Sequence, residues 1–386
     1  MDARIERETL SKLHCTIPSA LAPALVEALE GMGIPEAYVQ RGKQLALEER
    51  RGLLAPLFGS NLGRTELAED RAEIWRFHLP RELEAAAAWR VAEACDLFLP
   101  GRGSLFAEDV SLLRAAPADF SAARAALAAE APLAGREPKD FTVLCCIVQR
   151  GLGDPLSRTI LEMGLCVPAV SFGLGMGLRN RLGLLRITIP VEKEVMYFAV
   201  PSSDAPLVAG VAVRKARLDR PGQGFIYRYP VRAYAVNNLV RRGGRRHVAT
   251  MEQVIEALDE MRGSTEWRRI AAAPGSKPRQ PGQAGEPGKN LVCFSLVCDE
   301  GRATELVKAA MDSGAGGATL VQLGHRAPAR EGQAPSRHAR ETCDLIVPEE
   351  LVEPLEEVMA AGGLFGEGAY GLVEVTRVER ALTFQG

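Results

Sequence analysis

A Gly-x-Gly turn occurs three times in the sequence, and its backbone N–H groups could bind an anion. The copies are Gly101-Arg102-Gly103, Gly222-Gln223-Gly224 and Gly366-Glu367-Gly368. Glycine allows turn conformations and a close approach to a ligand, so several N–H groups can point at one phosphate or carboxylate. The same turn can equally be a tight connection from a helix to a strand. The first two copies are therefore candidate binding sites, whereas Glu367 would repel an anion in the third.

Four arginines follow the second turn, in the stretch Arg241-Arg242-Gly243-Gly244-Arg245-Arg246. Guanidinium groups form forked hydrogen bonds with phosphate oxygens, so the cluster suits a polyphosphate or a nucleotide. A solvated basic loop, or a weak contact with RNA, would have the same composition. We expect the main ligand site to consist of Gly222, Gln223, Gly224, Arg241, Arg242, Arg245 and Arg246.

Two more glycines, Gly173 and Gly175, are secondary candidates for the ligand site. They belong to a run from Gly173 to Leu178 that lacks the spacing of a dinucleotide fingerprint and does not join a strand to a helix. We predict a flexible loop here. The nearby Arg179, Arg181 and Arg186 would add positive charge to the ligand site or to a surface for a partner.

No set of side chains predicts catalysis or a metal centre. His14 and His78 fall in expected strands, which favours a structural role, and the remaining histidines show no spacing typical of metal ligands. The eight cysteines include no Cys-x-x-Cys pair, and most lie in or beside apolar runs, which indicates reduced thiols in the core. We therefore expect a protein that is not an enzyme and requires no cofactor.

The charge balance and hydropathy exclude several classes of protein. Lys+Arg 47 against Asp+Glu 49 gives a formal net charge of -2, so no overall basic field would hold nucleic acid or an anionic membrane. The sequence contains no uninterrupted apolar run long enough to cross a membrane, and its first residues are charged. We expect a cytoplasmic protein without a nucleic-acid partner and without membrane insertion.

One pattern of strands and helices recurs three times along the chain, and each copy contains one of the Gly-x-Gly turns. Each copy has a short apolar strand, an amphipathic helix ending at a glycine, a second strand, a loop, a third strand ending in proline, a helix, the turn and a fourth strand. This order is that of the βαββαβ ferredoxin-like unit. The first strands are Leu13–Ile17, Thr142–Val148 and Leu291–Val297, the helix-ending glycines are Gly33, Gly164 and Gly314, and the prolines are Pro80, Pro201 and Pro348.

The repeat predicts an α+β chain of three tandem ferredoxin-like domains. Their expected ranges are 10–114, 140–270 and 290–386, separated by an Ala-rich connector at 115–139 and a Pro/Gly linker at 271–289. The first domain has the longest loop, Lys43 to Asp70, and the second ends in a helical extension that begins with a capping box at Thr250.

The second repeat carries the clearest resemblance to a known family. Phe172-Gly173-Leu174-Gly175 follows its second strand, and Pro221 to Val231 is similar to the B-loop and last strand of the PII signal-transduction family. The resemblance extends, more weakly, over 10–112, 140–270 and 289–382. Members of that family form trimers with nucleotide clefts between subunits and a T-loop that contacts target proteins. The resemblance thus implies three PII-like domains packed as a pseudo-trimer within one chain.

The resemblance also implies a function. The expected protein is a signalling regulator that binds a small anionic metabolite, with ATP, ADP or AMP as the expected effector, in clefts between domains. Its loops would regulate a target protein, either a transporter or a metabolic enzyme. The lysine that follows the family's Gly-x-Gly is replaced by Ser104, Phe225 and Ala369. This loss favours an alternative, a ligand-free scaffold that acts only as a protein-interaction platform.

Overall fold

The structure, a computed structural model, describes residues 6–50, 64–128, 137–177, 192–220, 222–242, 290–327 and 336–383. The first repeat contains β1 (Glu6–Pro18), α1 (Ala22–Gly31), β2 (Ala37–Arg50), β3 (Arg64–Leu79), α3 (Glu84–Ala94) and β4 (Ser104–Arg114), and α4 (Ser121–Leu127) follows it. The second contains β5 (Lys139–Gln149), α5 (Gly153–Glu162), β6 (Ala169–Gly177), β7 (Glu192–Pro201), α6 (Ala205–Ala216), β8 (Gly224–Ala235) and β9 (Arg241–Arg242). The third contains β10 (Leu291–Asp299), α9 (Ala303–Asp312), β11 (Gly317–Ala327), β12 (Ser336–Pro348), α10 (Val352–Ala361), β13 (Gly371–Val378) and β14 (Arg380–Thr383).

The three repeats have the same strand order. In each, the first strand lies between the third and the fourth, and the second strand pairs with the third, giving β2-β3-β1-β4, β6-β7-β5-β8 and β11-β12-β10-β13. This antiparallel arrangement is the ferredoxin-like one. The predicted α+β class and the threefold repeat are therefore confirmed. The domain boundaries stay predictions, and the linker at 271–289 and the helical extension after Thr250 lie outside the described residues.

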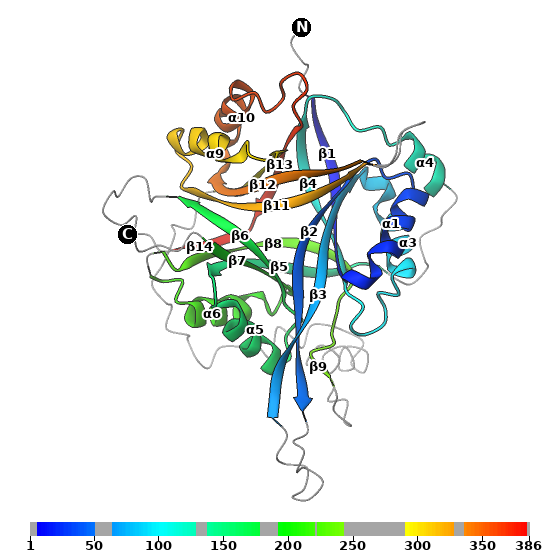
Figure 1. Ribbon diagram of the computed structural model, residues 1–386, viewed down its shortest axis with the longest axis vertical. Coiled ribbons are helices and arrows are strands. Elements are labelled where there is room, and N and C mark those ends of the chain that lie inside the picture. The colour runs from blue at the N-terminus through cyan, green and yellow to red at the C-terminus, as the bar shows by residue number, and fades with distance from the viewer. Residues whose placement is uncertain are drawn as a thin grey trace, which may run out of the picture.

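The three sheets join edge to edge into one closed assembly (Figure 1). The second strands of the repeats meet one another, since β2 pairs with β6 and with β11, and β11 pairs with β6. The fourth strands also meet, because β4 pairs with β13 and with β8, and β14 extends the edge of β8. An unpaired edge invites unwanted strand addition, and this closure leaves each repeat with both edges covered.

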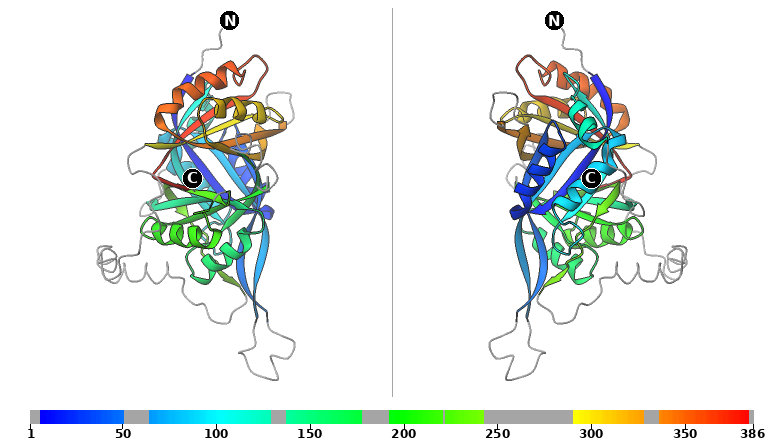
Figure 2. Two further views of the ribbon diagram at one scale, coloured as in Figure 1. Left: turned by 90° about the vertical axis from the view of Figure 1, so that its left-hand side faces the viewer. Right: turned by 90° about the vertical axis from the view of Figure 1, so that its right-hand side faces the viewer.

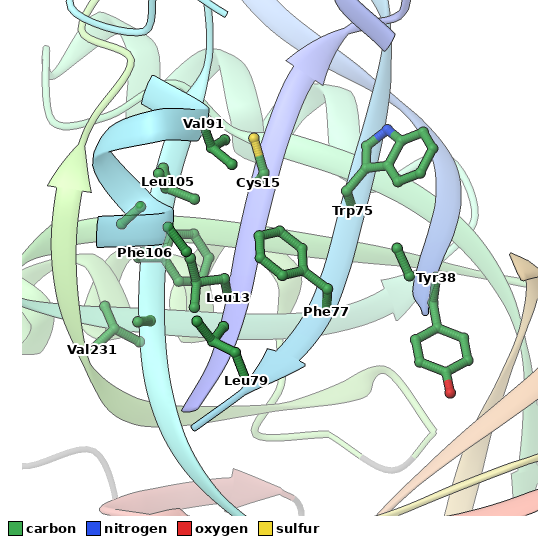
Figure 3. Close-up of a cluster of buried hydrophobic side chains, with 14 of the residues drawn as sticks. Leu13, Cys15, Tyr38, Trp75, Phe77, Leu79, Val91, Leu105, Phe106 and Val231 are labelled. Carbon is green, nitrogen blue, oxygen red and sulfur yellow. The ribbon is translucent and has the colours of Figure 1, made fainter. Parts of the chain in front are cut away.

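The helices lie outside and the sheets inside. Figure 2 shows the three helix pairs at the periphery, and α1 contacts α3, α5 contacts α6 and α9 contacts α10. Alternation along β1 and β3 sends apolar residues to the helices and polar residues to the interior of the assembly, whereas β5 is apolar on both faces. In β1, Leu13 and Cys15 pack with Phe77 of β3, Val91 of α3 and Leu105 of β4, as Figure 3 shows.

The hairpin of β2 and β3 is longer than the sequence indicated. The expected loop from Lys43 to Asp70 is wrong over much of its length, because β2 continues to Arg50 and β3 begins at Arg64. The physical reason is burial in a neighbouring repeat. Leu45 and Leu47 lie in the core of the second repeat, so the hairpin is held there as a strand pair.

The structure confirms the predicted helix ends but not the loop predicted at Gly173. The helix-ending glycines Gly33, Gly164 and Gly314 have the expected positive φ, 66°, 68° and 109°, which is the conformation of a left-handed helix end. Gly173 and Gly175 lie in β6, so the flexible loop expected there is wrong for residues up to Gly177. Within the described ranges, no helix is both long enough and apolar enough to cross a bilayer.

Candidate functional site

The first Gly-x-Gly turn is covered by a segment of the second repeat. The Gly101 amide donates a hydrogen bond to Asn237 Oδ1 at 3.0 Å, and the Asn237 amide donates to Ser104 Oγ at 2.9 Å. The side chain of Leu239 lies 2.7 Å from where a Cβ on Gly101 would be. Arg102 turns back to Asp96 Oδ2, at 2.9 Å. The groups predicted to bind an anion in this turn are thus engaged by the chain itself.

The second turn, Gly222 to Gly224, is contacted by side chains of two neighbouring strands. The Gly222 carbonyl accepts hydrogen bonds from Gln149 Nε2 at 3.1 Å and from Lys193 Nζ at 3.4 Å. Gln223 is half-buried. Gly224 has a φ of +139°, and a Cβ there would overlap the carbonyl oxygen of Ile147. Gly103 approaches the Thr16 carbonyl in the same way, so the second glycine of the first two turns is required for strand packing, whereas nothing lies within 4 Å of a Cβ on Gly368.

The predicted arginines do not join the second turn. Arg241 and Arg242 form β9, which runs beside Leu47 and Glu48 of β2, and Arg242 forms an ion pair with Asp70. Gly224 begins the 12-residue strand β8, which ends at Ala235 before these arginines are reached, a strand length of about 40 Å. The structure therefore places the two halves of the predicted main site at different repeat boundaries. Arg245 and Arg246 lie outside the described residues.

The glycines of the second strands mark a junction between the repeats. A Cβ on Gly42 would lie 2.6 Å from the Val170 carbonyl oxygen, one on Gly173 would lie 2.8 Å from that of Leu320, and one on Gly324 would lie 2.9 Å from a Val39 methyl group. Each repeat thus uses a glycine to approach the next. Gly175 pairs with Thr319 of β11. The structural role of Gly173 and Gly175 is close strand pairing.

A large groove lies over this junction. It has a volume of about 1520 Å³ and draws its walls from α1, β2 and β3 of the first repeat, β6 and β7 of the second, and β11 and β12 of the third. We call it the junction groove. Phe172 and Leu174 of β6 line it and are 52% and 43% exposed. Gly173 is also in its wall, so one of the predicted site residues lies in this groove.

Beneath the groove, a buried polar network links the first and third repeats. Glu36 accepts hydrogen bonds from Arg114 Nη1 at 2.7 Å and from the Tyr370 hydroxyl at 2.7 Å, and His325 Nε2 lies 3.3 Å from it. Burial would raise the pKa of Glu36, but the His325 hydrogen bond, the Arg114 charge and the Tyr370 hydrogen bond outweigh it and lower the pKa to about 2. The carboxylate is thus held ionised at the interface.

A second cavity, the central chamber, lies where the inner faces of the three sheets meet. Its volume is about 50 Å³, and many of its lining residues are polar or charged. Lys12 forms an ion pair with Glu374, and His14 Nε2 donates to Glu108 Oε1 at 2.6 Å. Burial would lower the pKa of Lys12, but Glu374 and Glu108 raise it on balance. The charged and titratable lining residues are Lys12, His14, Arg76, Glu108, Asp344 and Glu374, with Tyr38, Tyr197, Tyr227, Tyr229 and Cys293.

Comparisons with known proteins do not identify a family for this chain. No protein-family model and no curated protein matches the sequence. Among solved structures, the chain is similar to the aspartate kinase from Synechocystis, with 11% identity over 96% of this chain and 44% of that one. The chain thus spans less than half of the kinase's length. The TM-score is 0.20, which is too low to support an argument about function.

Neither cavity was predicted from the sequence, although a pattern in the strands indicates the chamber. Lys12, His14, Arg76 and His78 alternate with apolar residues in β1 and β3. Polar residues at every second position of a strand that is buried on its other face indicate a second, polar environment. The groove has no such pattern, because its walls come from three distant parts of the chain.

The buried His14 predicts a loss of stability in mild acid. Burial lowers its pKa from 6.5 to about 4, an effect that Glu108 only partly offsets. The folded chain therefore binds this proton more weakly than the unfolded chain, and stability falls as the pH drops through 6.5. We expect a loss of about 2 kcal/mol between pH 7 and pH 5.

Urea unfolding of the wild type and of His14→Gln at a series of pH values measures this effect. Glu36 adds a further loss only below its unfolded pKa of about 4.5, and Asp344, whose pKa burial raises, acts in the opposite sense in both proteins. The difference between the two proteins therefore isolates His14. Equal losses in both would show that His14 is not responsible.

Proposed function

We propose that the chain is a non-catalytic PII-like regulatory protein that controls a partner protein, a transporter or a metabolic enzyme, by docking it at the junction groove. The observation that supports this function best is the groove itself. It lies where the second strands of all three repeats meet, and it exposes Phe172 and Leu174. Large apolar side chains that remain exposed in a hollow are typical of interaction sites.

The engaged turn residues favour the interaction platform over nucleotide sensing. Asn237 and Leu239 cover the first turn, and the arginines lie at a different boundary from the second turn. A nucleotide would need the N–H groups of a turn and several cations at one place. The interaction platform does not require nucleotide binding.

A nucleotide sensor remains the second candidate because of one observation. Lys193 of β7 brings its ammonium group to 3.4 Å from the Gly222 carbonyl. Arg150 and Lys193 both line the junction groove. A lysine from another strand thus supplies positive charge beside a turn whose own sequence lacks the family's lysine. ATP, ADP or AMP would place its phosphates there.

The absence of catalysis is part of the proposal, and the state of the cysteines supports it. All eight are buried free thiols. Burial raises the pKa of Cys146 to about 12 and that of Cys95 to about 11. The thiolate is the reactive form of cysteine, so these groups are poor nucleophiles at neutral pH.

Site-specific crosslinking tests the platform. A photoreactive residue replaces Phe172 in the full chain, and the same residue at Leu207 of α6, which is 49% exposed and outside the groove, serves as control. We expect a crosslinked protein, identified by mass spectrometry, from position 172 and not from 207. The purified partner should then bind the wild type at least tenfold more tightly than Phe172→Ser/Leu174→Ser. Equal crosslinking at both positions, or equal affinities, would contradict the proposal.

A thermal-shift panel with ATP, ADP and AMP decides between the two candidates. A ligand at 100 times its dissociation constant stabilises a protein by about 2.7 kcal/mol, which is readily seen as a higher melting temperature. The platform predicts no shift. A shift with one nucleotide that disappears in Lys193→Met would establish the sensor instead.

A further inference from the structure

The unpaired charges of the junction groove are mainly acidic. Glu27 and Glu30 project from α1, one helical turn apart, and Glu300 lies in the wall supplied by the third repeat. All three are exposed. None has an ion-pair partner in the part of the chain that the structure describes. The groove therefore presents negative charge from the first and the third repeat.

Most cations in the groove wall already have partners. Arg150 pairs with Glu192 at 2.5 Å and Arg340 with Asp299 at 2.6 Å. Arg340 also stacks on the Tyr370 ring at 4.3 Å, and the Arg326 guanidinium lies 5.6 Å from the centre of the Trp75 ring. Lys193 Nζ lies 3.4 Å from the Gly222 carbonyl oxygen, and Arg41 forms no ion pair with an acid in the described part of the chain. An incoming molecule thus meets more unpaired acids than bases.

The size of the groove points to a stretch of polypeptide. Small-molecule pockets have volumes of about 300–1,000 Å³, and the groove has about 1520 Å³. Its apolar lining residues include Phe172 and Leu174 of β6 and Val26 of α1. A segment of about ten residues, with apolar side chains on one side and charged ones on the other, would match both the volume and the mixture of surfaces.

We infer that the junction groove binds a basic amphipathic segment of a partner protein. Its apolar side chains pack on Phe172 and Leu174, and its lysines or arginines lie opposite Glu27, Glu30 and Glu300. This inference rests on the proposed function, which assigns partner docking to the groove. Because the three acids are exposed to solvent, their attraction is screened by salt, so the affinity falls as the ionic strength rises.

Designed peptides test the charge preference directly. The probes are three fluorescent 12-residue peptides: one of lysine and leucine, one with glutamate in place of lysine, and one with serine in place of leucine. We expect the lysine–leucine peptide to bind the full chain, measured by fluorescence anisotropy, at least tenfold more tightly than either of the others. No binding of the lysine–leucine peptide below 1 mM, or equal affinity for the glutamate peptide, would overturn the inference.

Matched variants locate the binding. Glu27→Gln/Glu30→Gln should weaken the lysine–leucine peptide at least tenfold, and Phe172→Ser/Leu174→Ser at least tenfold. Glu353→Gln/Glu357→Gln changes the net charge equally, but on exposed residues of α10 outside the groove, and should have no effect. Equal weakening by both charge variants would show a general charge effect and overturn the inference.

Failure of the inference can be told apart from failure of the proposed function. If the peptides fail while crosslinking from position 172 still gives a partner, the groove docks a protein of different chemistry. If crosslinking from position 172 fails as well, both the inference of a basic segment and the proposed docking function are contradicted.

Discussion

Replacing Lys12 with methionine should lower the free energy of unfolding by about 3–5 kcal/mol, since the change leaves buried carboxylates without their cation. The Lys12 ammonium forms an ion pair with Glu374 and lies 3.8 Å from Glu108 Oε1, and each of the two glutamate side chains is only 5% exposed. Burial would raise the pKa of Glu374, but Lys12 and His78 keep it below its usual value. Methionine fills a similar volume and supplies no charge.

Urea unfolding at pH 7.5 measures this loss, with Lys43→Met as the control. Lys43 also forms two ion pairs, with Glu69 and Asp154, but those carboxylates are about half exposed. Exposed pairs contribute little, so the control should lose less than about 1 kcal/mol. The deficit of Lys12→Met should also shrink as the pH falls, because Glu374 can then take up a proton. Equal losses in the two variants would show that the central chamber is hydrated enough to screen its charges.

Replacing Gly224 with alanine should destabilise the chain by more than about 3 kcal/mol, or prevent folding, because two costs add. Gly224 has a φ of +139°, which L-residues avoid, and its Cβ would overlap the Ile147 carbonyl, so β5 and β8 would have to separate. Gly224 was predicted from the sequence to belong to a ligand site. This variant therefore also shows whether the role of Gly224 is structural.

The variant Gly151→Ala separates the cost of the positive φ from the cost of the steric overlap. Gly151 has a φ of +89°, but nothing lies within 4 Å of the position of its Cβ. Alanine there meets only the backbone strain, of about 1–3 kcal/mol. Melting temperatures or urea midpoints of the two variants should therefore differ clearly. A Gly224→Ala chain as stable as Gly151→Ala would mean that the strand pair can move apart at little cost.

The repeat unit was predictable because its signals are local. A glycine after an amphipathic helix ends that helix wherever the helix packs, and Gly33, Gly164 and Gly314 do so in the structure. The extent of β2 was not predictable in this way. Leu45 and Leu47 stay in a strand because they are buried in a core formed by residues about 100 positions later.

The candidate ligand site was also only partly predictable, because its geometry depends on residues that are distant in the chain. The spacing of glycines in the turn at Gly101 is visible in the sequence, but its use depends on Asn237, which is 136 positions away in the chain. Arg241 and Arg242 are close to Gly224 in sequence, yet an entire strand separates them. Local composition identified groups capable of binding an anion, and only the assembly of the repeats decides which of them are available.

The edge-to-edge closure of three unlike repeats has a consequence for how such a protein can change. In a ring of identical subunits, one substitution alters every interface at once, and the ring dissociates when the protein is dilute. Here each boundary has its own residues, so Asn237 can cover the turn at one boundary while the junction of the three second strands keeps a wide groove. The ring is also held by the covalent chain, and its closure is therefore independent of protein concentration.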